Sequence, residues 1–182
     1  MTIAAFAGSL RKGSFNRMLL RAVLELVPAG IRVVPFDIDD VPLYNADLDE
    51  DDVLPAPVKR LRDAIRSADA LLVVSPENNY SLPAVTKNVL DWASTDETVL
   101  DGKPTAVMGA SPGVYGTTRM QIQLRQVAVA TNMLVINDPA VLVARCREKF
   151  DSDGRLTDET IRKKIPEMLE AFASFARRLK AK

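Results

Sequence analysis

The stretch Gly8-Ser9-Leu10-Arg11-Lys12-Gly13-Ser14-Phe15-Asn16 joins an apolar run, Ile3 to Ala7, to a helical pattern that begins near Ser14. A strand, a polar loop and a helix start in this order present backbone N–H groups and a helix N-terminus to an anion. The side chains add neutral donors and a guanidinium suited to bidentate phosphate contact, from Ser9, Ser14, Asn16 and Arg11. We therefore predict a phosphate-binding loop, with an ordinary polar turn before a capped helix as the alternative.

The spacing of this loop excludes two common nucleotide motifs. Gly8 and Gly13 are spaced as in a Walker A loop, but Ser14 and Phe15 replace the lysine and hydroxyl residue that should follow. Leu10 stands where the dinucleotide fingerprint needs its second glycine. A terminal monophosphate, held without a metal, fits this loop better.

Apolar runs of strand length alternate with helical patterns along the whole chain. The predicted strands are Ile3–Ala7, Ile31–Phe36, Ala70–Ser75, Thr105–Ala110 and Met133–Ile136. The predicted helices are Ser14–Val27, Pro57–Ser67, Pro83–Ala93, Tyr115–Ala130 and Thr157–Leu179, the last kinked or divided by Pro166. This alternation predicts an α/β fold, a flavodoxin-like doubly wound five-stranded parallel sheet of order 2-1-3-4-5 with helices on both faces.

Ligands bind such sheets beyond the carboxyl ends of the strands, where the loops after strands 1, 3 and 4 converge. The second loop, Ser75 to Pro83, is rigid and rich in amide and backbone N–H groups, which suits a flat heterocycle with alternating C=O and N–H edges. The third loop, Gly109 to Arg119, contains three glycines, which allow its backbone to approach a ligand closely. The three loops together predict one pocket.

Composition narrows the possible functions. With 182 residues, 47% of them hydrophobic, we expect a single domain over residues 1–182. Acidic and basic residues balance at 24 each, and no apolar run could span a membrane, so neither nucleic acid nor a membrane is an expected partner. The chain enters a strand at once, without a charged leader, which predicts a cytoplasmic location.

The chain contains no histidine, so it cannot build a Ser-His-Asp or Cys-His nucleophile system, and the usual zinc ligand sets are missing. An enzyme of this composition would carry its chemistry in a cofactor. The lone Cys146 lies between two arginines that could favour the thiolate, but we interpret it as incidental. The acidic segment Asp37 to Asp52 lacks the spacing of an EF-hand and is interpreted as a surface loop, and Trp92 as a core or interface residue.

The chain resembles the NAD(P)H-dependent FMN reductase family, which includes bacterial chromate, quinone and azo-dye reductases. The residues that carry the resemblance are G-S-x-R-x-x-S-x-N from Gly8 to Asn16 and P-E-x-N-x-S from Pro76 to Ser81. Agreement continues in Pro83-x-x-x-Lys87-Asn88-x-x-Asp91-Trp92 and, more weakly, through Ser111, Gly113 and the turn Asp153 to Asp158. The similarity therefore extends over nearly the whole chain.

The resemblance implies one FMN per subunit, with no metal. The phosphate would be held by Ser9, Arg11, Ser14 and Asn16 and by the backbone at Phe15. The edge of the isoalloxazine ring would be lined, mostly through backbone groups, by Pro76, Glu77, Asn78, Asn79, Tyr80 and Ser81, and its far side would be closed by Ser111 and Gly113. NADPH or NADH would deliver hydride to flavin N5 in a ping-pong cycle, and a quinone, flavin, azo compound or metal oxyanion would take the electrons. A homodimer or homotetramer is expected.

Asn78 stands where the family usually has tyrosine, which removes an aromatic surface near the flavin or at a subunit boundary. Backbone contacts to FMN should survive this change, and Tyr80 could partly compensate for it. The alternative class is a flavodoxin-like electron carrier that binds FMN without reacting with pyridine nucleotides. Such carriers are usually strongly acidic, whereas this chain is charge-balanced.

Overall fold

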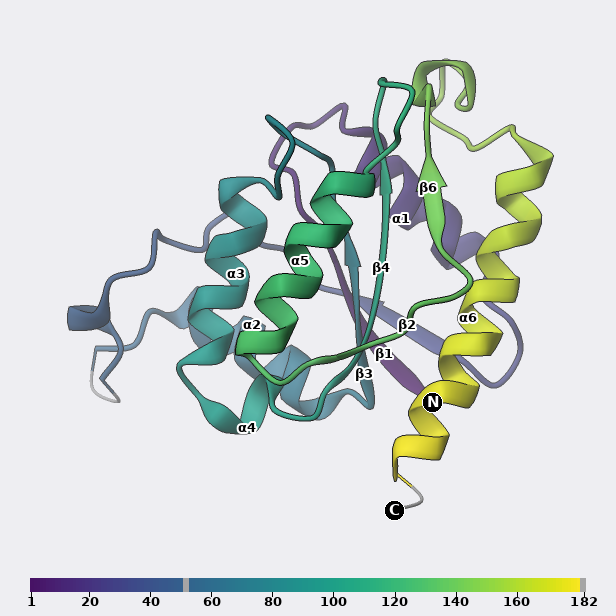
Figure 1. Cartoon of the computed structure of the whole chain (residues 1–182). Coiled ribbons are helices and arrows are strands. Elements are labelled where there is room, and N and C mark those ends of the chain that lie inside the picture. The colour runs from purple at the N-terminus through teal and green to yellow at the C-terminus, as the bar shows by residue number, and fades with distance from the viewer. Residues whose placement is uncertain (51–52, 181–182) are drawn as a thin grey trace.

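A parallel β-sheet lies between two layers of helices in the computed structural model, which describes residues 1–50 and 53–180 (Figure 1). Its strands are β1 (Thr2–Ala7), β2 (Arg32–Pro35), β3 (Ala70–Val74), β4 (Pro104–Ala110), β5 (Leu134–Val135) and β6 (Val141–Val143). The order β2-β1-β3-β4-β5 and the parallel direction of every pair confirm the flavodoxin-like fold. The sheet reverses its order between β1 and β3, so the predicted ligand position lies beyond those strands.

The helices divide between the two faces of the sheet. Helices α1 (Phe15–Glu25) and α6 (Glu159–Lys180) cover one face (Figure 1). The other face is covered by α2 (Ala56–Ser67), α3 (Ala84–Ser94), α4 (Glu97–Leu100) and α5 (Thr118–Ala130). Two short 3₁₀ helices, η1 (Ala46–Leu48) and η2 (Cys146–Glu148), lie in connecting segments.

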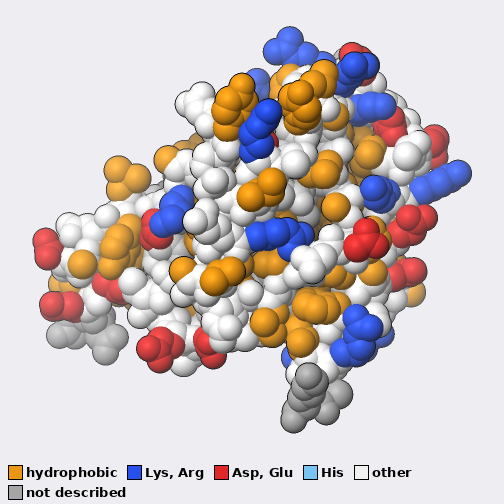
Figure 2. Space-filling model, in the orientation of Figure 1, with side chains coloured by type: hydrophobic (Ala, Val, Ile, Leu, Met, Phe, Trp, Pro, Cys, Tyr) orange, Lys and Arg blue, Asp and Glu red, His pale blue; other side chains and the backbone are white. Residues whose placement is uncertain are grey.

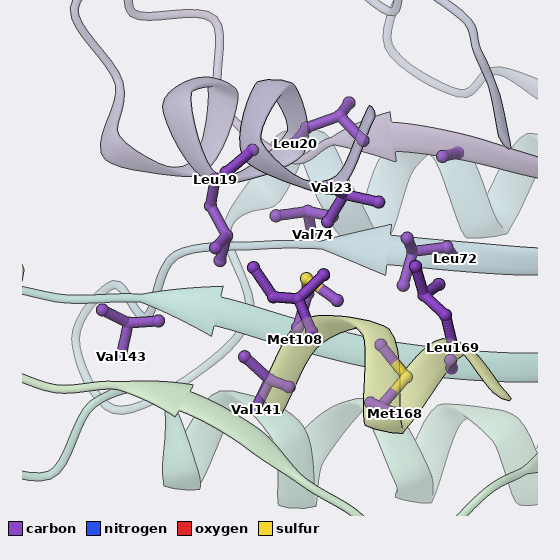
Figure 3. Packing of buried hydrophobic residues seen from close by; sticks show 14 of the residues in the cluster. Leu19, Leu20, Val23, Leu72, Val74, Met108, Val141, Val143, Met168 and Leu169 are labelled. Atoms are coloured by element: carbon purple, nitrogen blue, oxygen red, sulfur yellow. The ribbon is translucent and has the colours of Figure 1, made fainter. Parts of the chain in front are cut away.

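Both faces of the central strands are buried, because each strand contributes alternate side chains to two separate cores. On the α1 and α6 face, Leu72, Val74 and Met108 meet Leu19 of α1 and Met168 of α6 (Figure 3). All five residues of β3 and all seven of β4 are buried. Each fully buried aliphatic side chain contributes on the order of 1.5–3 kcal/mol, so these cores fix the strand ends from which the loops leave.

The last strand differs from the prediction, because two short strands replace one. Strand β5 pairs with the start of β4, and β6 pairs with its end, at Met108 to Ala110. Pro139 lies between them, and a proline has no N–H to continue a ladder. The apolar run Val141 to Val143 was the available signal for β6.

Two helices also differ from their predicted bounds. Helix α5 begins at Thr118, three residues later than predicted, because Gly116 adopts a left-handed conformation with φ of 61°. Helix α6 continues through Pro166 without division. In its apolar stripe, Ile165, Leu169 and Phe172 are fully buried, and their burial exceeds the cost of about 3 kcal/mol for an internal proline.

The acidic segment is a surface loop, as predicted, and arginines hold its carboxylates. Asp39 pairs with Arg17, and Asp49 accepts a hydrogen bond of 2.5 Å from the largely buried Arg62. Asp51 and Asp52 lie outside the described residues. Trp92 is completely buried, which confirms its assignment to the core. Among the described residues, no helix is both long and apolar enough to cross a membrane.

Candidate functional site

A cleft of about 520 Å³ lies beyond the carboxyl ends of β1, β3 and β4, and the three predicted loops form its walls. Of the predicted site residues, it brings together Ser9, Arg11, Ser14, Phe15, Asn16, Pro76, Glu77, Asn78 and Ser111. Four others, Asn79, Tyr80, Ser81 and Gly113, are not among its lining residues. Sequence reasoning did not single out Leu10, Pro83, Ala110 and Pro112, which lie within the predicted loops, or Ala84 and Val85, which follow the second loop at the start of α3.

The first loop leaves backbone donors available at the cleft. Ser14 caps α1, with its Oγ accepting a hydrogen bond of 3.2 Å from the N–H of Asn16. In the described part of the chain, the N–H groups of Leu10 to Gly13 and of Phe15 meet no hydrogen-bond acceptor. The first turn of α1 has no acidic residue, and Arg11 is exposed beside it. Of these donor residues, Leu10, Arg11 and Phe15 line the cleft, and N–H groups and a positive charge at a helix N-terminus favour an anion, so this end of the cleft is the candidate anion site.

Asn16 joins the first loop to the third. Its side-chain amide donates to the carbonyl of Ala110 at 2.9 Å, and its Oδ1 accepts from the N–H of Ala110 at 2.8 Å. Asn16 is buried, so this pair of hydrogen bonds fixes the start of α1 against the end of β4. The geometry gives the Asn16 side chain a positioning role for the first loop.

Arg17 also positions the first loop, and the sequence analysis missed it. Its Nε donates to the carbonyl of Ser9 at 2.9 Å, and its guanidinium pairs with Asp39 in the acidic segment. The interaction gives the Ser9 carbonyl a cationic hydrogen-bond donor and ties the first loop to the acidic segment. No local pattern identifies such a residue, because its partner Asp39 lies 22 positions further along the chain.

Gly8 allows the first and second loops to lie in contact. A Cβ at this position would come within 2.1 Å of the Thr86 Oγ1 and 2.8 Å of the Ser75 Oγ. These two hydroxyls are buried and lie 2.9 Å apart, hydrogen-bonded to each other. Only glycine fits against this pair, so the first glycine of the motif has a packing role.

The second loop closes on itself in a tight turn. Asn78 and Ser81 exchange backbone hydrogen bonds of 3.0 and 2.9 Å, and the residues between them, Asn79 and Tyr80, have φ of 49° and 64°. Two positive φ values define a type I′ turn, which places Asn79, Tyr80 and Ser81 outside the cleft. The turn fixes the backbone of Asn78 at the cleft wall.

Glu77 holds the second loop to the N-terminus of α5. Its Oε2 accepts from the N–H groups of Arg119 and Met120 at 2.9 and 3.2 Å, and its Oε1 accepts from the Arg119 guanidinium at 3.3 Å. A carboxylate at a helix N-terminus is stabilised by the unpaired N–H groups and by the helix dipole. The Glu77 side chain therefore serves the loop architecture and leaves the backbone to face the cleft.

The third loop is fastened to the segment after β6. The N–H of Gly113 donates to the Ser111 Oγ at 3.2 Å, and the Ser111 carbonyl accepts from the N–H of Cys146 at 3.1 Å. Burial raises the pKa of the Cys146 thiol to about 11, and the positive charges of Arg147 and Arg11 only partly oppose it. Cys146 is fully buried, which confirms its interpretation as incidental.

Comparison with known proteins agrees with this geometry. A sequence model of the family described as NADPH-dependent FMN reductase matches residues 1–148. An NAD(P)H-dependent FMN reductase of Pseudomonas aeruginosa is 42% identical over 179 residues, which cover 98% of this chain and 96% of that protein. A quinone reductase of Escherichia coli is 37% identical over 183 residues, 99% of this chain and 97% of that protein.

Solved structures give the same result. The flavoenzyme NAD(P)H:(acceptor) oxidoreductase FerB of Paracoccus denitrificans superposes with a TM-score of 0.86 at 34% identity, over 97% of each chain. An archaeal flavodoxin, with a TM-score of 0.58 at 16% identity, shares the fold alone.

The fold and the cleft, together with these relatives, define the class: a flavin-dependent oxidoreductase built on a flavodoxin-like sheet. Within that class, the chain belongs to the NADPH-dependent FMN reductase family. It is an enzyme that uses FMN as cofactor and NAD(P)H as co-substrate.

Proposed function

We propose that the chain is an FMN-dependent reductase of small quinone-type acceptors, with the FMN phosphate at the first loop and the ring system against the second. Ser9, Arg11, Ser14 and the Phe15 N–H would hold the phosphate, with Asn16 positioning them. The ring edge would meet the backbone of Pro76 to Asn78, while the turn Asn79 to Ser81 holds this wall in place. Ser111 would close the far side, with Gly113 supporting it.

The observation that carries the proposal is the set of free N–H groups at the N-terminus of α1, beside the Ser14 hydroxyl and the exposed Arg11. Only neutral and positive groups of the first loop face this end of the cleft, which suits a dianionic monophosphate. The cleft volume of about 520 Å³ lies within the usual range of cofactor sites.

FMN, when bound, supplies the redox chemistry by accepting hydride from NAD(P)H and then passing two electrons to an acceptor in a ping-pong cycle. The residues of the chain bind and orient the cofactor. None of the lining residues is a histidine or cysteine, and the carboxylate of Glu77 is engaged by α5. Proton transfer to the acceptor therefore relies on solvent at the cleft mouth. The quinone class of acceptor is supported by the related quinone reductase of Escherichia coli.

The first test follows the visible absorbance of the FMN-reconstituted protein under anaerobic conditions while NADPH or NADH is added. We expect the flavin band to bleach, and to return when a benzoquinone is added. A yellow protein that neither nucleotide bleaches would contradict the reductase proposal and favour an electron carrier. Loss of all flavin absorbance on desalting, in a folded protein, would contradict the proposed site.

We also propose that the chain forms a homodimer or homotetramer through the outer face of α5. Ile122 and Val129 lie two turns apart on this helix, largely exposed, and the exposed Gln126 between them is uncharged. A helix face of this kind meets its own copy without charge repulsion. Light scattering should therefore report an oligomer, and the double variant Ile122→Lys, Val129→Lys should be smaller. A monomeric wild-type protein would overturn this proposal.

A further inference from the structure

Three side chains form a stack beside the cleft mouth. The Arg119 guanidinium lies 4.1 Å from the centre of the Tyr80 ring and 4.6 Å from the centre of the Tyr115 ring. Tyr80 comes from the second loop and Tyr115 from the third, so the stack joins two walls of the cleft. In Figure 2, apolar side chains flank a basic one at this end of the molecule. We call Tyr80, Arg119 and Tyr115 the aromatic stack.

The rings of the aromatic stack are not core residues. Tyr80 is 70% exposed and Tyr115 is 63% exposed, so little apolar burial holds either ring in place. Arg119 is held from behind, because both its backbone N–H and its guanidinium bind Glu77. A fixed cation between two rings orders both of them and leaves part of each aromatic surface open to solvent.

The backbone conformation of Tyr80 is energetically unfavourable for a residue with a large side chain. Tyr80 adopts φ of 64° at the third position of the type I′ turn, where glycine is preferred. A left-handed conformation is unfavourable for a bulky residue, and an exposed ring does not offset it by burial. Strain of this kind is found at ligand sites more often than in ordinary turns.

We propose that the aromatic stack is the docking surface for planar aromatic electron acceptors of the quinone class, and that it sets the preference for them over non-planar acceptors. Electron-poor flat rings stack on tyrosine faces. The stack adjoins the wall of the cleft, because Arg119 binds Glu77 and Tyr80 follows Asn78 in the turn, and both Glu77 and Asn78 line the cleft. A compact octahedral anion such as ferricyanide has no flat face and gains nothing from the tyrosine faces. The inference rests on the proposed reductase function.

The test compares 2-methyl-1,4-naphthoquinone with ferricyanide as acceptors for the FMN-loaded enzyme. For Tyr115→Leu we expect kcat/KM for the naphthoquinone to fall about threefold to tenfold, the value of one aromatic pair, with ferricyanide reduction within about twofold of wild type. The matched control is Val114→Ala, which alters an exposed apolar neighbour in the same loop. The control should leave the ratio of the two kcat/KM values unchanged.

A second variant separates docking from folding. Tyr80→Asn places in the turn a residue that tolerates positive φ, so the FMN-free protein should unfold at or above the wild-type temperature. The ratio of naphthoquinone to ferricyanide kcat/KM should nevertheless fall, as for Tyr115→Leu. A clear drop in the unfolding temperature with an unchanged ratio would assign the stack a structural role and overturn the proposal.

Further results of these measurements would also overturn the docking role of the aromatic stack. An equal loss with both acceptors, or no loss with either, would overturn the docking role. So would a change in the light-scattering mass of Tyr115→Leu, because the ring would then belong to a contact between subunits. Failure of the underlying reductase function looks different, since the wild-type flavin would then not bleach with NADPH or NADH before any acceptor is added.

Discussion

The two ends of the cleft are built in opposite ways. At the phosphate end, between Gly8 and Asn16, neutral side chains and Arg17 fix the loop, and several backbone N–H groups are left without an acceptor in the described structure. At the ring end, between Ser75 and Pro83, Asn78 and Ser81 exchange two backbone hydrogen bonds in a tight turn, and a charged side chain, Glu77, ties the loop to α5. The first end is therefore held by neutral side chains and one arginine, and the second by a tight turn and a carboxylate.

This difference predicts which residues should contribute mainly to FMN affinity and which mainly to the free energy of unfolding. A ligand gains most where it satisfies donors that the fold has already oriented, because their ordering is part of folding. Where a side chain is already engaged by another element, as Glu77 is by α5, that side chain contributes mainly to stability. Substitutions at the two ends should therefore separate FMN affinity from the free energy of unfolding.

The largest effect is expected where the two ends meet. Gly8→Ala would place a Cβ within 2.1 Å of the Thr86 Oγ1, inside a buried contact. We expect a loss of about 2–3 kcal/mol in the free energy of unfolding, measured by chemical denaturation, and weaker FMN binding. Gly13→Ala is the matched control, because a Cβ there meets no atom within 4 Å. Equal free energies of unfolding for the two variants would contradict the close contact between the first and second loops.

At the phosphate end, we expect FMN affinity to fall in both variants below, while the free energy of unfolding should change little for the exposed Arg11 and fall by about 1 kcal/mol for Ser14, which caps α1. Ser14→Ala and Arg11→Ala should each weaken FMN binding by about 1–3 kcal/mol, the range for a hydrogen bond to a charged group. Fluorescence titration of FMN measures this effect. Ser67→Ala, which removes an exposed hydroxyl at the end of α2, should leave the affinity unchanged. Wild-type affinity in both loop variants would place the phosphate elsewhere.

At the ring end, we expect stability to change more than affinity. Glu77→Gln keeps the shape of the side chain but removes the charge that faces the N-terminus of α5, at a cost of about 1 kcal/mol in unfolding free energy. Glu170→Gln, on the exposed side of α6, should cost almost nothing. If Glu77→Gln instead reduced FMN affinity and left the unfolding transition in place, the contrast between the two ends would be wrong.

The smallest effect is expected at Cys146, which supports the third loop. Because burial raises the pKa of its thiol to about 11, iodoacetamide should label it at neutral pH only after unfolding. The folded protein holds this proton more tightly than the unfolded chain, whose thiol titrates near 9.0. The contribution to stability is therefore complete below pH 9 and lost as the pH rises toward 11. Rapid labelling of the native protein would contradict this assignment.

Sequence patterns predicted the strands, their order and the loops at their ends, because these features depend on local runs of apolar residues. Continuous apolar runs located β1, β3 and β4, and their alternation with helices gave the strand order. The loops that line the cleft follow directly from those strand ends, which is why most of the predicted site residues meet there.

The sequence did not predict contacts between distant segments. Asn16 binds Ala110, 94 positions away, and Glu77 binds the start of α5, 42 positions away. Both residues were expected to face a ligand, since their types suit that role, but only the packed fold shows that other segments engage their side chains. The late start of α5 has a similar cause, because the left-handed backbone at Gly116 is not encoded by the helical pattern.

Trp92, the only tryptophan, is completely buried, and its Nε1–H donates to the carbonyl of Pro42 at 2.8 Å. The Tyr44 ring packs edge-on against it, with 5.0 Å between ring centres. Pro42 and Tyr44 belong to the acidic segment, and Trp92 to α3. The protein thus carries its single tryptophan fluorophore at the junction of these two parts. Its emission should be blue-shifted and protected from acrylamide when the segment is docked, and a red shift should report undocking without any added label.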